Sequence, residues 1–273
     1  MFVRFPALAL LLVSLASAAC AERAGHTLTL SGSTSLQPLA EKWADAYQAR
    51  HSGLAVAVQG GGSTAGVQSA LSGAAQIGMS SHVLTVAELH DVRAIQVARD
   101  GIALVVHPSN PLGDLSLDAV KSIYAGDVKD WQRLHGPARA ITVITREEGS
   151  GTRAAFESLV MGKQPISSSA LVQDSTGAVR QMVSSDPAAI GYISIGLVDA
   201  SVKALQLNGV AATEANIDRG AYPLVRPFLF VVRGEPNAQT RGFIAWVSGP
   251  EGRELARREG MLPPSQEGPD ARR

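Results

Sequence analysis

The chain has 273 residues, of which 45% are hydrophobic and 18% are charged. This composition is ordinary for a globular protein, and the length suits one large domain or two moderate ones. The 24 Lys and Arg residues balance the 24 Asp and Glu residues, so the formal net charge is zero. Because no cluster of Lys and Arg forms a basic face, we expect no nucleic-acid partner. We expect a ligand to be bound by a few local residues and not attracted by the electrostatic field of the whole protein.

Residues 1–20 predict an export signal. Arg4 precedes an apolar run, ALALLLVSLASAAC, which is too short for a confident membrane span and ends in small residues. The single cysteine, Cys20, cannot form an internal disulfide. Its position resembles a bacterial lipoprotein signal, in which the cysteine carries the lipid, although Ser17 stands where that motif prefers Leu. Cleavage after Ala18 without lipidation is the alternative.

Three segments share one plan, in which a strand leads through a corner of Gly, Ser and Thr into a helix. The strands are HTLTL, LAVAVQ and AITVIT, the corners are SGSTS, GGGSTAG and REEGSGT, and the helices are LQPLAEKWADAY, VQSALSG and RAAFESLVMG. The first helix places Leu36, Leu39, Trp43 and Tyr47 at helical spacing. In the third helix we expect Phe156, Leu159 and Val160 to face inward and Gly162 to end the helix.

The corners carry groups that suit an anion. The first N–H groups of a helix have no partner within it, and the helix dipole makes them partly positive. Glycine allows close approach of the backbone, and Ser and Thr add hydroxyl donors. A single corner of this kind is explained by ordinary helix capping. Three corners that follow strands predict a shared oxyanion site, because open α/β sheets place ligands at the carboxyl ends of their strands.

The remaining segments continue an α/β pattern. We expect a short strand in 74–80 with a helix from Thr85, two strands around a turn in 94–112, a helix in the first half of 116–134, a helix and a strand in 177–198, a strand in 222–233 and two helices in 238–260.

Six runs of the chain, in order, resemble the phosphate-binding solute receptors of bacterial high-affinity ABC uptake systems. They are SGSTSLQPLAEKWADAY, VQGGGSTAGVQSAL, QIGMSSHVLT, GIALVVHPSNPL, ITVITREEGSGTRAAF and DPAAIGYISIG, and the resemblance covers residues 28–259. It implies an α/β, two-lobed periplasmic-binding-protein fold (type II), in which each lobe is a mixed sheet flanked by helices. Two hinge crossings would join the lobes, which close over one anion.

The resemblance also implies the division of the chain. Lobe 1 would hold residues 25–106 and 229–262, lobe 2 residues 107–228, and residues 263–273 would form a disordered tail. The crossings would be ALVVHPSNP and VRPFLFVV, with Pro108 and Pro227 where regular structure must end.

The family's anion contacts fall on matching residues of this chain. The resemblance implies phosphate binding by Thr34, Ser35, Ser63, Ser81, Arg146, Ser150, Gly151 and Thr152. Arg146 would be the one cationic contact, with a fork that suits phosphate oxygens, unless it merely pairs with Glu147 or Glu148. Ser81 departs from the family, since many relatives have aspartate there.

Other functions fit the sequence less well. A serine hydrolase would need Gly-x-Ser-x-Gly, but Thr64 and Ala65 follow Ser63. A phosphate loop for nucleotides would need Gly-Lys-Ser/Thr, which GGGSTAG lacks. No paired His, Cys or acidic clusters predict a metal site, and His82 is expected near the lip of the ligand site.

We therefore expect an exported, periplasmic receptor that binds inorganic phosphate and delivers it to an ABC permease, as a monomer without cofactor or catalytic activity. Two alternatives keep the fold. In one, the ligand is another tetrahedral oxyanion of the sulfate or molybdate class. In the other, the protein senses or scavenges phosphate without transport.

Overall fold

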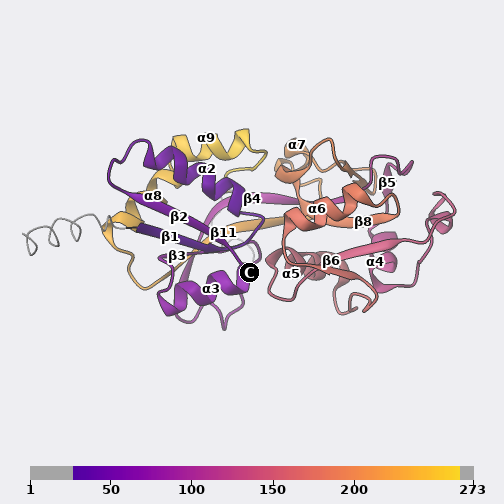
Figure 1. Ribbon diagram of the computed structural model, residues 1–273, viewed down its shortest axis with the longest axis horizontal. Coiled ribbons are helices and arrows are strands. Elements are labelled where there is room, and N and C mark those ends of the chain that lie inside the picture. The colour runs from indigo at the N-terminus through magenta and orange to yellow at the C-terminus, as the bar shows by residue number, and fades with distance from the viewer. Residues whose placement is uncertain (1–26, 265–273) are drawn as a thin grey trace, which may run out of the picture.

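The computed structural model describes residues 27–264. Two halves lie side by side, and two long strands, β4 and β11, run between them (Figure 1). Within the described residues, one nine-stranded sheet has the order β2-β1-β3-β11-β4-β8-β6-β7, with β9 beside β4. Its strands are β1 (Thr27–Gly32), β2 (Ala55–Gly60), β3 (Ile77–Ser80), β4 (Val92–Val106), β6 (Thr142–Arg146), β7 (Leu171–Gln173), β8 (Ala189–Ser194), β9 (Lys203–Ala204) and β11 (Val225–Arg233).

The first half contains β1, β2 and β3, which are parallel, and the parts of β4 and β11 that pair with each other. Its helices are α2 (Gln37–Gln48), α3 (Ser63–Ser72), α8 (Ala238–Ser248) and α9 (Pro250–Arg258). Helices α2, α8 and α9 pack against one face of the sheet, and α3 packs against the other (Figure 1).

The second half contains β6, β7, β8 and the end of β4. Its helical segments are α4 (Leu117–Ala125), η1 (Trp131–Leu134), α5 (Gly151–Phe156), η2 (Glu157–Met161), α6 (Thr176–Ser185), η3 (Ile195–Leu197) and α7 (Glu214–Asp218). A separate two-stranded sheet pairs β5 (Asp114–Leu115) with β10 (Gln206–Leu207). Helix α6 packs on one face of the main sheet, and α4 and α5 pack on the other.

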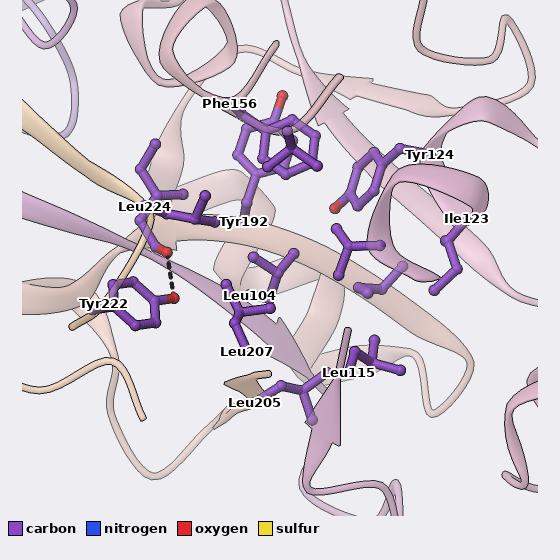
Figure 2. Close-up of a cluster of buried hydrophobic side chains, with 14 of the residues drawn as sticks. Leu104, Leu115, Ile123, Tyr124, Phe156, Tyr192, Leu205, Leu207, Tyr222 and Leu224 are labelled. Atoms are coloured by element: carbon purple, nitrogen blue, oxygen red, sulfur yellow. Dashed lines mark hydrogen bonds between the residues drawn. The ribbon is translucent and has the colours of Figure 1, made fainter. Parts of the chain in front are cut away.

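The core of the second half is rich in aromatic side chains (Figure 2). The rings of Phe156 and Tyr192 stack with centroids 4.3 Å apart, and Tyr124 packs against both. The hydroxyl of Tyr192 lies 2.7 Å from that of Thr145 and accepts the backbone N–H of Arg146 at 3.3 Å. Burial raises the pKa of Tyr192 to about 12, so this hydroxyl stays neutral and fixes the end of β6.

The strand, corner and helix pattern predicted at the N-terminal end is confirmed. In strand β1 every second residue is buried and the residues between them are exposed or half-buried, and Leu36, Leu39, Trp43 and Tyr47 of the following helix region are all buried. The second and third units also form as expected, as β2 with α3 and β6 with α5.

The prediction of two strands around a turn in residues 94–112 is wrong. Strand β4 runs unbroken from Val92 to Val106, because β11 pairs with it through Gly101 and β8 pairs with it from Ile102 onward. The change of partner between Gly101 and Ile102 is where β4 passes from one half to the other. Ala103 and the β4 residues after it pair with β8.

The helix predicted from Thr85 does not form. Thr85 and Glu88 make a capping box, with Thr85 N–H donating to the Glu88 carboxylate at 2.8 Å and Glu88 N–H donating to the Thr85 hydroxyl at 3.2 Å. Only a single turn follows, because β4 begins at Val92.

Leu159 does not face inward as predicted, since it is 41% exposed. Helix α5 changes into the π-helical turn η2, in which Gly162 N–H donates to the Glu157 carbonyl. A π turn holds more residues than an α turn, so the side-chain positions rotate. Val160 and Met161 take the buried positions, and Gly162 ends the helix as expected, with φ of 63°.

Candidate functional site

Four strands end at the boundary between the two halves, and a polar corner follows each of them. In the first half β1, β2 and β3 are parallel, so their carboxyl ends meet at one edge of the sheet. In the second half β6 ends at Arg146, directly before the corner that opens α5. The topology thus brings the predicted corners together.

Four of the predicted side chains form one hydroxyl cluster, which consists of Ser35, Ser63, Ser81 and Thr152. The Ser35 hydroxyl lies 3.0 Å from that of Thr152 and 3.4 Å from that of Ser81, and the Ser63 hydroxyl lies 3.3 Å from that of Ser81. All four residues are buried. Because each hydroxyl can rotate to donate, the cluster can direct several hydrogen bonds at one small oxyanion.

Further hydrogen bonds join the two halves around this cluster. The backbone N–H of Thr64 donates to the Gly149 carbonyl at 3.1 Å. The backbone N–H of Thr176 donates to the Thr34 hydroxyl at 3.4 Å, so Thr34 contacts the second half beside the cluster. The halves therefore meet directly at the site.

Two glycines permit this close approach. Gly62 has a φ of 88°, and a Cβ there would lie 2.9 Å from the Gly149 carbonyl oxygen. A Cβ on Gly151 would lie 2.2 Å from Ser63 Oγ and 2.7 Å from Ser81 Oγ. The predicted Gly151 thus lies against the cluster, in a position that tolerates no side chain.

Ser150 is buried beside the cluster but its hydroxyl has a local partner. It accepts the backbone N–H of Arg153 at 3.3 Å and so caps α5. Any contribution of Ser150 to a ligand therefore competes with its role as a helix cap.

Arg146 is 1% exposed and is bound by several groups. Its Nε and Nη2 donate to the two oxygens of Glu147 at 2.8 Å each, and its Nη1 donates to the Thr176 hydroxyl at 2.9 Å. Backbone carbonyls of Gln173 and Asp174 accept further hydrogen bonds from it. Pairing with Glu147, the alternative left open by the sequence, is thus present. In residues 27–264 no hydrogen bond joins Arg146 to the hydroxyl cluster.

A second buried arginine, Arg226 in β11, does contact the cluster. Its Nη1 donates to the Thr152 hydroxyl at 2.7 Å and to the Ser81 carbonyl oxygen at 3.5 Å. Arg226 lies outside the motifs that predict the site. The available signal was a lone arginine in the apolar run YPLVRPFLFVV, since a charged side chain in a buried strand requires a partner.

That partner is Asp100 in β4, which is completely buried. Asp100 Oδ2 accepts from Nε and Nη2 of Arg226 at 2.9 and 2.7 Å, and Oδ1 accepts the Ser194 hydroxyl at 2.8 Å. Burial raises the pKa of the Asp100 carboxyl, and Arg226 with Ser194 acts in the opposite direction.

His82 lies next to the cluster on the first half. Its Nδ1 is 3.1 Å from the Ser80 hydroxyl and its Nε2 is 3.4 Å from the Glu88 carboxylate. Burial lowers the pKa of His82, although Glu88 opposes this shift.

Comparisons with known proteins place the chain in a family. Residues 17–251 match the model of the PBP superfamily domain. The phosphate-binding protein PstS of Bacillus subtilis is 33% identical over 231 residues, which cover 83% of this chain and 76% of that protein. PstS of Pseudomonas aeruginosa is 28% identical over 267 residues, covering 86% of this chain and 82% of that protein.

Solved structures with the same fold include two phosphate receptors. A putative phosphate ABC transporter substrate-binding protein with bound phosphate from Clostridium perfringens has a TM-score of 0.85 and 34% identity, covering 88% of this chain and all of that one. An ABC-type phosphate transport receptor from Vibrio cholerae has a TM-score of 0.73 and 37% identity, covering 87% of this chain and all of that one. The two-lobed fold expected from the sequence is confirmed, and the chain belongs to the PBP superfamily, in the family of the phosphate-binding proteins PstS.

Proposed function

We propose that this protein binds inorganic phosphate between its two halves and delivers it to an ABC permease for phosphate uptake. The observation that carries the proposal is the hydroxyl cluster, in which Ser35 and Ser81 come from one half and Thr152 from the other. Buried hydroxyl donors beside arginine form a site for a small oxyanion. The family supports the same ligand, since the related Clostridium perfringens protein holds phosphate.

Phosphate would act by holding the halves together. An anion that contacts Ser35, Ser63 and Ser81 on one side and Thr152 on the other stabilises the closed arrangement, because only that arrangement offers all the donors at once. The halves would rotate about the points where β4 and β11 pass between them. Strand pairing favours a division near Gly101 in β4 over the expected boundary at residue 106.

The predicted site residues fall into two groups under this proposal. Ser35, Ser63, Ser81, Gly151 and Thr152 would surround the anion directly. Thr34, Arg146 and Ser150 would contribute from its border, where each already has a hydrogen-bond partner.

The role requires no chemical step at the site, and the related proteins from Bacillus subtilis and Vibrio cholerae are named for phosphate binding and phosphate transport. The closed form, populated when phosphate is bound, would be the form that a permease recognises. A role as phosphate sensor or scavenger keeps the same site. Radioactive phosphate uptake by cells with and without the gene distinguishes uptake from those roles, since only uptake requires the transport rate to fall on deletion.

The proposed location is periplasmic. In the described part of the chain, no helix has the length and apolar character needed to cross a membrane. The export signal and Cys20 lie outside the described residues. If Cys20 carries lipid, Cys20→Ala should release the protein from membranes or block its processing, whereas a native chain that begins at Ala19 would contradict lipidation.

Calorimetric titration of the mature protein with phosphate, sulfate and molybdate tests the proposal. We expect one phosphate per chain and tighter binding of phosphate than of the other two anions. Absence of phosphate binding, or tighter binding of sulfate or molybdate, would contradict it.

A further inference from the structure

We propose that Arg226 binds the anion directly and that Asp100 positions it, so that the ligand contacts the connection between the two halves. This inference rests on the proposed phosphate site and adds a cationic contact that the sequence did not indicate. It also places the charge of the site on β11, one of the two strands that pass between the halves.

The guanidinium of Arg226 has two different edges. Nε and Nη2 both donate to Asp100 Oδ2, at 2.9 and 2.7 Å, so this edge is fixed by the neighbouring strand. Residues Arg226 and Asp100 are direct partners in the register of β11 and β4. Nη1 points the other way, 2.7 Å from the Thr152 hydroxyl and 3.5 Å from the Ser81 carbonyl.

The second edge therefore faces the hydroxyl cluster. The contact at 3.5 Å lies at the limit of a hydrogen bond and satisfies Nη1 poorly. A phosphate oxygen in the cluster would accept a charge-assisted hydrogen bond from Nη1, which is stronger than the bond to a neutral hydroxyl. Arg226 is 2% exposed, so little water would screen this interaction.

The surroundings of the pair argue for a role beyond packing. A buried ion pair contributes little net stability, because removing both charges from water costs about as much as their attraction returns. Asp100 has a second partner, Ser194 of β8, which fixes the carboxylate and hence the direction in which the Arg226 guanidinium points. The pair lies where the pairing partner of β4 changes from β11 to β8, and where β11 leaves the second half. An anion on Nη1 would thus join Ser81 of the first half, Thr152 of the second half and the connecting strands.

The test measures phosphate affinity by calorimetry in Arg226→Gln, with Arg233→Gln as the matched control. Arg233 is an exposed arginine on the same strand, whose Nη1 donates to the Leu71 carbonyl. Loss of one partner of a buried charged contact should weaken phosphate binding by about 100-fold or more. The control should keep wild-type affinity. Thermal unfolding without phosphate verifies that each variant is folded.

If Arg226→Gln does not fold, two further variants test whether Arg226 contacts the anion. The double variant Asp100→Asn, Arg226→Gln removes both charges and leaves no buried ion alone. Arg226→Lys keeps the charge but lacks a fork that can contact Asp100 and the anion together. Both should lose at least about tenfold in affinity. Wild-type affinity in any folded variant lacking the Arg226 fork would overturn this inference and leave the phosphate receptor intact. If the wild-type protein itself binds no phosphate, the proposed function fails first.

Discussion

The Ser35 hydroxyl lies 3.0 Å from the Thr152 hydroxyl, although 117 positions separate the two residues in the chain. One follows β1 in the first half, and the other lies in the first turn of α5 in the second half. Neither side chain can make this contact unless the halves are closed. The hydroxyl cluster therefore forms only in the closed arrangement, and changes that prevent closure should weaken ligand binding without unfolding either half.

Gly151→Ala should prevent closure. The added methyl group would lie 2.2 Å from Ser63 Oγ, and overpacking of this kind typically costs about 1–3 kcal/mol. We expect phosphate affinity to fall by at least about tenfold, while the midpoint of thermal unfolding without phosphate stays close to that of the wild type. The control is Gly177→Ala in α6, where an added Cβ meets no atom within 4 Å. Equal phosphate affinity in Gly151→Ala and the control would show that this contact is not part of the bound form.

Arg146→Gln should affect both stability and binding. The variant loses the pair with Glu147 and the hydrogen bond to Thr176. Because Glu147 is partly exposed, its unpaired carboxylate can be hydrated, so we expect the free energy of unfolding to fall by about 1–3 kcal/mol. Phosphate affinity should fall by about tenfold, less than in Arg226→Gln, because Arg146 lies at the border of the cluster and acts on the anion from a greater distance.

Urea unfolding and calorimetry measure the two effects of Arg146→Gln separately. Arg180→Gln is the control, since Arg180 pairs with Asp199 on the surface. A loss of stability with unchanged phosphate affinity would make Arg146 a structural residue and would leave the cationic role to Arg226.

Ser81→Asp should sharpen the selection of phosphate over sulfate. The Ser81 hydroxyl can donate to either anion, whereas an ionised carboxylate accepts a hydrogen bond only from an anion that carries a proton. We expect Ser81→Asp to weaken sulfate binding at least about tenfold more than phosphate binding. The measurement is phosphate affinity in the presence and absence of excess sulfate. If excess sulfate does not change the phosphate affinity of the wild-type protein, the site contains another hydrogen-bond acceptor. Glu147 and Glu148 would be the first residues to test.

His82 should make stability depend on pH in mildly acidic solution. Its pKa in the folded protein is lowered from the ordinary value of 6.5, mainly by burial. The unfolded chain therefore takes up this proton at a higher pH than the folded chain does. The free energy of unfolding should then fall as pH drops below 6.5 toward the lowered pKa.

His82→Gln should reduce this dependence, which urea unfolding at several pH values can measure. His90→Gln is the control, because the His90 side chain is 81% exposed. The same pH dependence in wild type and His82→Gln would show that other groups cause it.

The sequence predicts most of the elements that build the site. Local patterns suffice for β1 with α2, β2 with α3 and β6 with α5, because the alternation of a strand, the corner residues and the helical spacing all lie within about 20 residues. The same corners carry Ser35, Ser63 and Thr152, which the structure brings together.

The predictions that proved wrong concern features that the local sequence patterns do not show. Arg99, Asp100 and Gly101 look like a turn locally, but β4 stays extended because β11, whose Arg226 is 126 residues from Asp100, pairs with it through Gly101. The contact of Arg226 with Thr152 spans 74 residues of the chain, so no local motif predicts it. Leu159 is exposed because the helix widens into a π turn, which a regular helical period does not anticipate.

A crystal structure of the mature protein grown with phosphate tests the central claim most directly. We predict one anion between the two halves, within hydrogen-bond distance of the Ser35, Ser63, Ser81 and Thr152 hydroxyls and of Arg226 Nη1. A phosphate bound outside this cluster, or a hydroxyl cluster that stays free of the anion at saturating phosphate, would contradict the account.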